Sequence, residues 1–190
     1  MKRLDLVVGP NGAGKSTFVE LTLQPLLPRS VFVNADLIAK QRWPEQAQEK
    51  SYEAAQIAAK TRNQLMEQGR SFIAETVFSH ESKLDLIDDA QQAGFTVVLH
   101  VLLVPEPLAV RRVEYRTESG GHAVPEAKIR ERFRRLWPLV AVAIMRTDEA
   151  TIYNSAEGVA PSVVAEYTAG TLVGIARWPS WSPPVLTGLI

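Results

Sequence analysis

The chain alternates between short apolar runs and longer stretches in which apolar residues recur at helical spacing. Six runs rich in β-branched, aromatic or other apolar residues predict strands: residues 3–8, 30–35, 71–76, 95–104, 150–154 and 172–178. Five stretches predict helices: residues 15–24, 44–69, 81–93, 107–117 and 125–146. Strands that alternate with helices are typical of α/β proteins, so we predict a mostly parallel sheet covered by helices on both faces.

Size and charge narrow the classes of function. With 190 residues, 46% of them hydrophobic, the chain is predicted to form one domain spanning residues 1–190. Basic and acidic residues number 21 each, so no net charge draws the protein to nucleic acid or to an anionic membrane. No apolar run approaches the roughly 20 residues of a spanning helix, and the absence of cysteine excludes disulfides and a cysteine nucleophile. We expect a cytoplasmic protein with no membrane partner.

The segment GPNGAGKS, from Gly9 to Ser16, matches the P-loop pattern in full between a predicted strand and a predicted helix. Glycines let such a loop turn tightly and present successive N–H groups to phosphate oxygens. In this pattern Lys15 reaches the β and γ phosphates of ATP, and the Ser16 hydroxyl ligates Mg²⁺. The alternative, a glycine-rich turn with a surface lysine, is disfavoured by the flanking strand and helix. The predicted nucleotide-binding residues of the loop are Gly9, Asn11, Gly12, Ala13, Gly14, Lys15, Ser16 and Thr17.

Two acidic residues follow predicted strands, at the end where α/β sheets bind ligands. Asp36 follows the second predicted strand, and Glu75 lies at the end of the third. Asp36 can act as a base toward an acceptor hydroxyl or hold Mg²⁺ through water, and it can also cap a helix that begins at Leu37. Glu75 and Thr76 are predicted to bind the acceptor, with a water-mediated Mg²⁺ contact of Glu75 as the alternative.

A basic segment runs from Arg111 to Arg135. Guanidinium groups suit phosphate oxygens and the charge that develops on a transferring phosphoryl group. Gly120 and Gly121 interrupt the segment, so its two helices can close over the nucleotide as a lid at about residues 107–135. The alternative is a solvated helix face, because glutamates are interleaved at i,i+4 spacing. The segment holds eight of the 21 basic residues: Arg111, Arg112, Arg116, Lys128, Arg130, Arg132, Arg134 and Arg135.

The signatures of two other P-loop classes are missing from the sequence. An ABC-type motor would carry its signature segment and a strand ending in an Asp–Glu pair, and a GTPase would carry an Asn/Thr-Lys-x-Asp motif; neither occurs. A kinase for nucleic-acid ends would need a basic groove with stacking aromatics, which the near-neutral charge outside residues 111–135 disfavours. A small-molecule kinase is the leading hypothesis. A nucleotide-binding switch or partner-binding module with slow ATP hydrolysis is the alternative.

Four stretches resemble, in order, the zeta toxin family of P-loop kinases: GPNGAGKST, NADLIA, AETVFSHESK and GGHAVPEAKIRERFRRL. The resemblance spans about residues 5–145. It implies a nucleoside-kinase-like α/β fold, phosphorylation of UDP-N-acetylglucosamine at the sugar 3′-hydroxyl, and an antitoxin protein as a candidate partner. The residues carried over by motif are Lys15 and Ser16 for ATP and magnesium, Asp36 for the base, Glu75 and Thr76 for the acceptor, and Arg116 for a lid arginine.

The chain departs from the zeta toxins in being shorter and in lacking their second lid arginine. His122 stands at that place, three residues before Pro125, and Arg130 or Arg134 in the next helix can supply the missing charge. This departure concerns the acceptor more than the chemistry, because short P-loop kinases also act on antibiotics, sugars and nucleosides.

The resulting hypothesis is an ATP-dependent kinase for a hydroxyl of a small molecule. The catalytic candidates are Asp36, Lys15 and Arg116. The arginines predicted to bind the nucleotide are Arg112, Arg130 and Arg134. The acceptor-binding candidates are Asp36, Glu75, Thr76, Ser79, His80 and His122. Outside the site, His100 is predicted to be a satisfied core histidine, and Trp178 and Trp181 are predicted to dock the C-terminal tail on the core.

Overall fold

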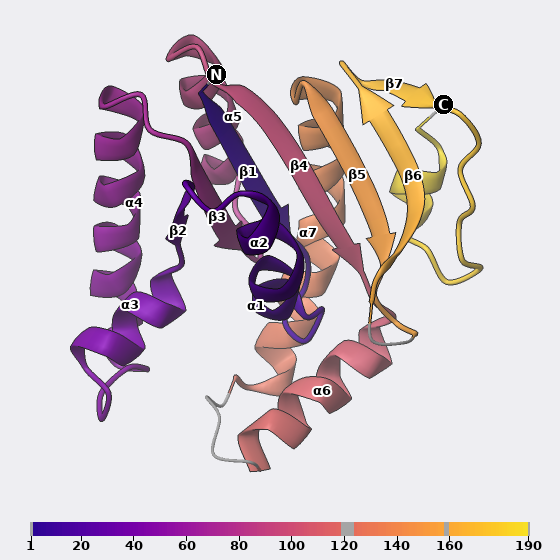
Figure 1. The fold of residues 1–190 in the computed structure, drawn as a ribbon. Helices are drawn as coiled ribbons and strands as arrows, with labels where there is room; N and C mark the ends of the chain where they lie inside the picture. The colour runs from indigo at the N-terminus through magenta and orange to yellow at the C-terminus, as the bar shows by residue number, and fades with distance from the viewer. Residues whose placement is uncertain (1, 119–123, 158–159, 190) are drawn as a thin grey trace.

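The computed structural model describes residues 2–118, 124–157 and 160–189. Within these ranges the strands form a seven-stranded sheet in the order β2-β3-β1-β4-β5-β6-β7 (Figure 1). β2, β3, β1, β4 and β5 are parallel, whereas β6 pairs antiparallel with β5 and β7 with β6. The predicted α/β fold with a mostly parallel sheet is confirmed. The strands are β1 Arg3–Val8, β2 Val31–Val33, β3 Phe72–Thr76, β4 Thr96–Leu103, β5 Glu149–Asn154, β6 Ser162–Thr168 and β7 Thr171–Val173.

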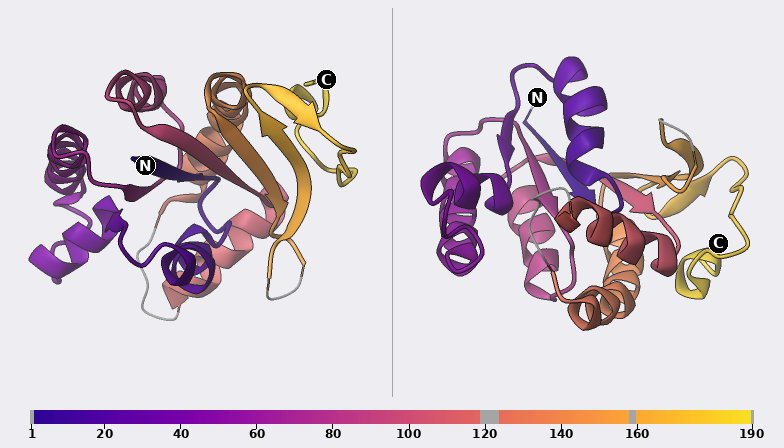
Figure 2. Two further views of the ribbon diagram at one scale, coloured as in Figure 1. Left: turned by 45° about the horizontal axis from the view of Figure 1, so that its top comes forward. Right: turned by 90° about the horizontal axis from the view of Figure 1, so that it is seen from below.

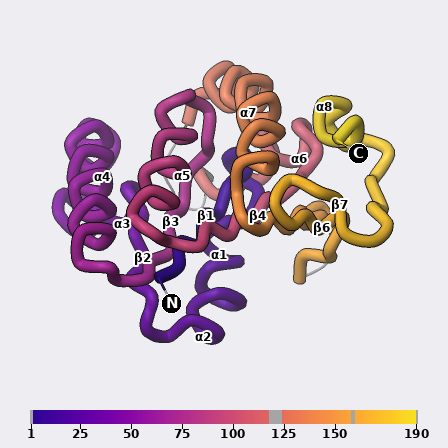
Figure 3. Tube along the Cα trace, turned by 90° about the horizontal axis from the view of Figure 1, so that it is seen from above, coloured from indigo at the N-terminus to yellow at the C-terminus, as the bar shows by residue number. Residues whose placement is uncertain are grey.

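Helices cover both faces of the sheet. Seen from above in Figure 3, α4, α5 and α7 lie on one side of the strands and α1 and α2 on the other. The helices are α1 Lys15–Phe18, the π-helical turn η1 Val19–Leu23, α2 Gln24–Leu26, α3 Ala35–Arg42, α4 Ser51–Glu67, α5 Ser82–Gln92, α6 Glu106–Glu118, α7 Glu126–Arg146 and α8 Pro184–Thr187.

The central strand β1 contributes to a core on each face because successive side chains of a strand point in opposite directions. Leu4 and Leu6 pack in the larger core, with α4, α5 and α7. Val7 packs in the smaller core, with Phe18 of α1 and Ala109 of α6. β1 is therefore buried on both sides, and the loop that follows it is held in place by both cores.

The carboxyl ends of the parallel strands meet at one edge of the sheet, where α/β proteins bind ligands. α1 and α6 lie at this edge, and α3 begins there beside β2 (Figure 1). In the view from below in Figure 2, α6 lies in front of the sheet. The strand ends, α3 and α6 together frame the candidate site.

Three predicted elements differ from the structure. The helix predicted over residues 44–69 begins only at Ser51, and residues 44–50 form turns that connect it to the separate helix α3. The helix predicted over residues 15–24 contains a π-helical turn just before Pro25, which has no N–H for the usual hydrogen bond. At the far edge, β7 ends at Val173, and β6 was not predicted. Its mixed residues give no continuous apolar run, because four of its seven positions are exposed.

A polar network is buried in the sheet on the face of α1. Asp5 is fully buried and accepts hydrogen bonds from Arg3 at 2.7 and 2.8 Å, and His100 Nε2 lies 2.9 Å from its Oδ1. Burial would raise the pKa of the Asp5 carboxyl, but the hydrogen bonds from His100 and Arg3 outweigh it and hold the pKa below its usual value. His100 is thus a core histidine with a partner, as predicted.

The C-terminal tail returns to the larger core. Trp178 and Trp181 pack against this core, as predicted, and Leu186 of α8 is fully buried in it. Within the part of the chain that the structure describes, no helix has the length and apolar character needed to cross a membrane.

Candidate active site

The P-loop, residues 9–16, connects β1 to α1 at the carboxyl edge of the sheet. Gly12 and Gly14 have φ values of 77° and 82°, in the left-handed region that favours glycine. A Cβ atom at Gly12 would lie only 2.5 Å from the carbonyl oxygen of Ala109 in α6. Glycine at this position therefore serves both the turn and the close approach of α6 to the loop.

Lys15 is the buried cation of the loop, with 7% of its surface exposed. Burial lowers the pKa of its ammonium group. The carboxylates of Glu75 and Asp36 oppose this shift, whereas the positive charges of Arg116 and Arg132 add to it. The P-loop lysine therefore lies within electrostatic reach of charged side chains from β3, α3, α6 and α7.

The loop retains polar groups that fit the phosphates of a nucleotide. Lys15 Nζ donates to one carbonyl oxygen, that of Pro10, at 3.0 Å. Asn11 Oδ1 is buried and has no hydrogen-bond partner among the described residues, but as an acceptor it does not suit phosphate oxygens. Lys15 and the backbone N–H groups of the loop are the donors that do. In the described ranges, no group of three or more His, Cys, Asp or Glu side chains could hold a metal alone. Mg²⁺ would therefore be held by the Ser16 hydroxyl together with phosphate oxygens, as is usual for this ion.

The P-loop is clamped by residues that follow β5. Ser155 Oγ donates to the carbonyl oxygen of Ala13 at 2.7 Å. Arg112 of α6 donates to the carbonyl oxygens of Ser155 at 2.9 Å, Ala156 at 3.3 Å and Gly12 at 3.4 Å. Arg112, which was predicted to bind the nucleotide, thus binds backbone carbonyls that shape the loop, and Ser155 was not predicted from the sequence.

The strand register brings Asn34 and Glu75 together. Val33 of β2 pairs with Ala74 of β3, so the residues that follow them are neighbours at the carboxyl edge. The Asn34 amide donates to Glu75 Oε2, and Ser16 Oγ donates to the same oxygen at 2.9 Å. Glu75 therefore lies directly beside the predicted magnesium ligand.

Asn34 also begins α3. Its Oδ1 accepts hydrogen bonds from the backbone N–H groups of Asp36 at 2.7 Å and Leu37 at 3.1 Å, which is the geometry of an N-cap. The alternative in which Asp36 caps a helix starting at Leu37 is wrong, because α3 begins at Ala35. The carboxylate of Asp36 makes no capping bond and lies in the first turn of α3, available to a ligand.

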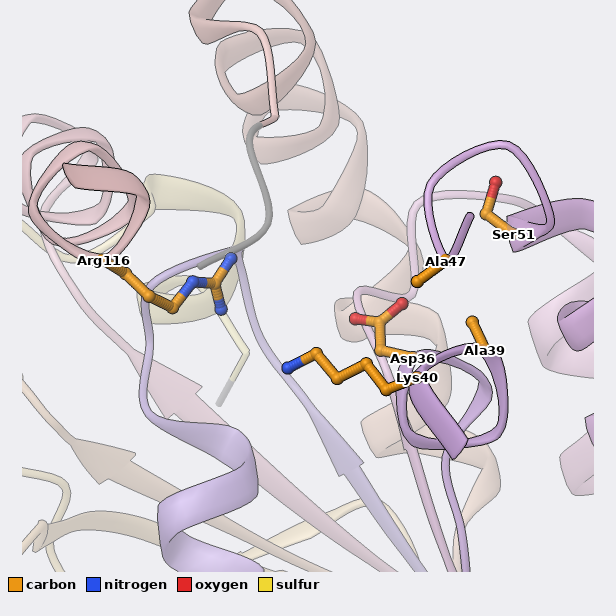
Figure 4. Close-up of a pocket in the computed structure, with 6 residues that line it drawn as sticks. All are labelled: Asp36, Ala39, Lys40, Ala47, Ser51 and Arg116. Atoms are coloured by element: carbon orange, nitrogen blue, oxygen red, sulfur yellow. The ribbon is translucent and has the colours of Figure 1, made fainter. Parts of the chain in front are cut away.

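Asp36 and Arg116 face one another across a cavity of about 40 Å³ between α3 and α6. Figure 4 shows the guanidinium group of Arg116 and the ammonium group of Lys40 entering this space from opposite sides, with the Asp36 carboxylate beside Lys40. Lys40 stands one helical turn after Asp36 and was not predicted. The cavity can accept a phosphoryl group between two cations and next to a carboxylate.

The lid arginines divide into two sets. Arg130 donates to Glu106 at 3.0 Å and to Glu126 at 2.8 Å, and Arg134 is exposed and donates to the Arg130 carbonyl oxygen. These two predicted nucleotide ligands are thus engaged by the protein itself, whereas the charges of Arg116 and Arg132 act on the P-loop lysine. Residues 120–122, which include the predicted lid break and His122, lie outside the described residues.

The segment after β3 holds the remaining acceptor candidates. Thr76 Oγ1 accepts from the N–H of Phe78, a fully buried residue with φ of 63°. His80 Nδ1 accepts from the N–H of Ser82 at 3.2 Å and lies 2.9 Å from its hydroxyl, so this ring supports the start of α5. Ser79 lies between them and is partly buried. The left-handed conformation of Phe78 is uncommon for a bulky residue, and it anchors this turn in the core.

Residues 4–139 match the family model AAA_33, the AAA domain. The match covers more than half of the chain and includes the P-loop, both acidic strand ends and the lid segment. The chain belongs to this AAA domain family. No curated protein matches it.

Solved structures show the fold of this AAA domain protein. The complex of AvrRxo1-ORF1 and -ORF2 with ATP has a TM-score of 0.70 at 16% identity, covering 91% of this chain and 60% of that chain. The PezAT chromosomal toxin–antitoxin system of Streptococcus pneumoniae has a TM-score of 0.67 at 15% identity, covering 87% and 71%. A gluconokinase from Sinorhizobium meliloti 1021 has a TM-score of 0.55 at 16% identity, covering 83% and 85%. The chain has a P-loop kinase fold and spans 60% of the length of the AvrRxo1 chain.

Proposed function

We propose that the protein is an ATP-dependent kinase that transfers the γ-phosphoryl group to a hydroxyl of a small molecule, with a nucleotide-activated amino sugar of the UDP-N-acetylglucosamine type as the leading acceptor. The observation that carries this proposal is the cavity in which Asp36 faces Arg116, two residues whose charges also act on the P-loop lysine. A carboxylate, two cations and a phosphate-binding loop in one place are the parts that phosphoryl transfer requires.

In the proposed reaction, the acceptor hydroxyl oxygen bonds to the γ phosphorus, and the bond from that phosphorus to the β–γ bridging oxygen breaks. The hydroxyl proton passes to the Asp36 carboxylate, and ADP leaves with the electrons of the broken bond. Lys15, Arg116 and Arg132 stabilise the negative charge on the transferring group. Positioning and charge neutralisation therefore supply most of the rate.

Magnesium would be bound next to Ser16 and would neutralise oxygens of the β and γ phosphates. The contact between Ser16 and Glu75 supports a role for Glu75 on the magnesium side, through water, rather than on the acceptor alone. Asn34 donates to Glu75 and caps α3, so it would hold both acidic residues in place. With Glu75 assigned to the magnesium side, Thr76 is the residue at the end of β3 that would contact the acceptor.

The lid is proposed to move as one unit. The ion pair between Arg130 and Glu106 joins α6 to α7, and so does a small apolar cluster that includes Val110, Val113 and Ile129. Because Ala109 and Arg112 hold the start of α6 against the P-loop, this unit would pivot there, and closure would carry Arg116 and Arg132 toward the phosphates and exclude water.

The structural neighbours support a kinase of the zeta toxin type as the finer hypothesis. One is a toxin–antitoxin system, and another is a two-component complex solved with ATP. An antitoxin is accordingly a proposed partner of this chain, and a cytoplasmic location is the proposed setting for a substrate such as a UDP-sugar.

The test is ADP release from ATP and Mg²⁺ with and without acceptors, beginning with UDP-sugars and continuing with free sugars, nucleosides and antibiotics. We expect at least one acceptor, a UDP-sugar first, to raise the rate of ADP release well above the rate with water. A rate that no acceptor changes would favour the nucleotide-binding switch with slow hydrolysis.

A further inference from the structure

A second cavity, here called the α4–α5 cavity, lies between α4, α5 and the end of β3. It has a volume of about 60 Å³. Arg62 of α4 and Lys83 of α5 line it together with Glu75 and Thr76, and the rest of its lining is apolar. The cavity therefore combines two cations with an apolar floor at the carboxyl edge of the sheet.

The two cations of this cavity, Arg62 and Lys83, are partly buried. Within the described ranges, neither Arg62 nor Lys83 makes an ion pair or a side-chain hydrogen bond. Burial lowers the pKa of the Arg62 guanidinium, and burial together with the charge of Arg62 lowers the pKa of Lys83. The one carboxylate that lines the cavity, Glu75, accepts hydrogen bonds from Ser16 and Asn34 instead.

Two unpaired, partly buried cations destabilise a folded protein unless something neutralises them. A ligand that carries negative charge would remove this cost and would gain charge-assisted hydrogen bonds from both side chains. The planar guanidinium group of Arg62 can donate to two phosphate oxygens at once, and Lys83 adds a second positive charge. A carboxylate, with one negative charge, would be neutralised by Arg62 alone. The chemistry of the cavity thus matches a phosphate group.

We propose that the α4–α5 cavity is an anion site in which Arg62 and Lys83 bind a phosphate group of the acceptor. The assignment of this phosphate group to the acceptor rests on the kinase function proposed above. Successive residues in the first turn of α3 line the two cavities, Asp36 the one with Arg116 and Ala35 the α4–α5 cavity. An acceptor whose phosphate lies in the α4–α5 cavity can therefore present a hydroxyl to Asp36 around this turn.

This site divides the candidate acceptors into two classes. Sugar phosphates and nucleotide sugars carry the required phosphate, whereas free sugars, nucleosides and aminoglycoside antibiotics do not. The inference therefore selects phosphate-bearing acceptors and excludes neutral or cationic ones.

The test is an NMR titration of inorganic phosphate into the full chain, with the P-loop filled by Mg²⁺ and a non-hydrolysable ATP analogue. The amide signal of Thr76 reports on the cavity. Wild type is compared with Arg62→Met and Lys83→Met, which remove each charge but keep an unbranched stem. Lys60→Met is the matched control, because Lys60 is an exposed cation on the same helix outside the cavity.

We expect saturable shifts in wild type and in Lys60→Met, and dissociation constants raised about 10-fold or more in the two cavity variants. Arg62→Lys keeps the charge and should retain most of the phosphate binding. It shows whether loss of binding in Arg62→Met comes from loss of the charge or from misfolding. Loss of an unpaired cation should also leave the thermal midpoint unchanged or raise it. The proposal is overturned if wild type shows no saturable shift, if both cavity variants bind phosphate as wild type does, or if both lose thermal stability.

The titration requires no turnover, so its result stands even if no acceptor is phosphorylated. Conversely, an active kinase whose KM for a sugar phosphate is unchanged by Arg62→Met would refute the anion site and leave the kinase function intact.

Discussion

Asn34 connects more of the site than any residue singled out from the sequence. Its carbonyl oxygen caps α3 and thereby fixes the turn that carries Asp36, while its amide group donates to Glu75. One side chain therefore positions the proposed base and the acid beside Ser16. These two contributions, capping and donation, can be separated by substitution.

Asn34→Asp is the variant that separates them. Asp is as good an N-cap as Asn, so α3 should persist, but the substitution removes the amide donor and places a second carboxylate beside Glu75. We expect a free energy of unfolding close to that of wild type. We also expect kcat/KM to fall ~10- to 100-fold, the range typical when a residue that hydrogen-bonds to a metal-binding group is lost. Asn34→Ala should in addition lose about 1 kcal/mol of stability. Wild-type activity in Asn34→Asp would show that Asn34 acts only as the N-cap of α3 and that its hydrogen bond to Glu75 does not contribute to activity.

The Asp5 network predicts a pH dependence of stability. The pKa of Asp5 is held below its usual value of 3.8 in the folded protein, so its contribution is present above pH 3.8 and is lost as the pH falls through the folded pKa. Asp5→Asn should therefore cost about 3 kcal/mol in urea unfolding at pH 7, and the deficit should shrink below pH 3.8. Asp89→Asn, at an exposed position of α5 beyond its first turn, is the control. If Asp5→Asn lost as much free energy of unfolding below pH 3.8 as at pH 7, the proposal that Asp5 is ionised in this network would be contradicted.

Among the elements, the contact between α6 and the P-loop has the clearest steric signature. A Cβ at Gly12, where φ is 77°, meets the Ala109 carbonyl oxygen at 2.5 Å, whereas one at Gly94, where φ is 78°, meets nothing within 4 Å. Both Gly→Ala variants should lose about 1–2 kcal/mol from backbone strain. We expect further destabilisation and weaker binding of an ATP analogue only in Gly12→Ala, measured by chemical unfolding and calorimetry. Equal behaviour of the two variants would show that α6 is free to move away.

The lid supplies an element-scale test of which arginines act on the phosphates. Arg132→Met should lower kcat by about 10³, the effect of removing an arginine that stabilises a transferring phosphoryl group. Arg135→Met on the same helix is the control, because Arg135 pairs with Glu131 on an exposed face. Acceptor-dependent ADP release measures both variants. Equal rates in the two would contradict the assignment of Arg132 to the phosphates.

The elements recovered from the sequence are those with strong local signals. The strands β1, β3 and β4 are apolar runs buried on both faces, and α6 and α7 have amphipathic periodicity, so their existence was predicted within a few residues. The edge strand β6 has mixed residues and depends on pairing with β5, which no local pattern encodes. The helix α3 entered the prediction only through the alternative role of Asp36 as a cap, because the true cap, Asn34, lies inside the predicted strand of residues 30–35.

At the scale of the whole molecule, the site was predictable where its geometry is local and unpredictable where it depends on the sheet. The glycine spacing of the P-loop encodes its own backbone conformation. By contrast, the neighbours of Glu75, the Ser155 clamp and the effect of the Arg132 charge on Lys15 follow from strand order and helix packing. Arg112, Arg130 and Arg134 were chosen for their charge and their place in the basic segment, and the structure shows them bound to protein groups.

The central claim is phosphoryl transfer to an acceptor with Asp36 as the base. The most direct measurement is the amount of ADP and of phosphorylated acceptor formed from ATP and a UDP-sugar, by mass spectrometry, in wild type and in Asp36→Asn. We predict equal amounts of the two products in wild type, and in Asp36→Asn a rate ~10²- to 10⁴-fold lower with ATP-analogue binding retained. ADP formed without any phosphorylated acceptor, or transfer by Asp36→Asn at the wild-type rate, would contradict the account.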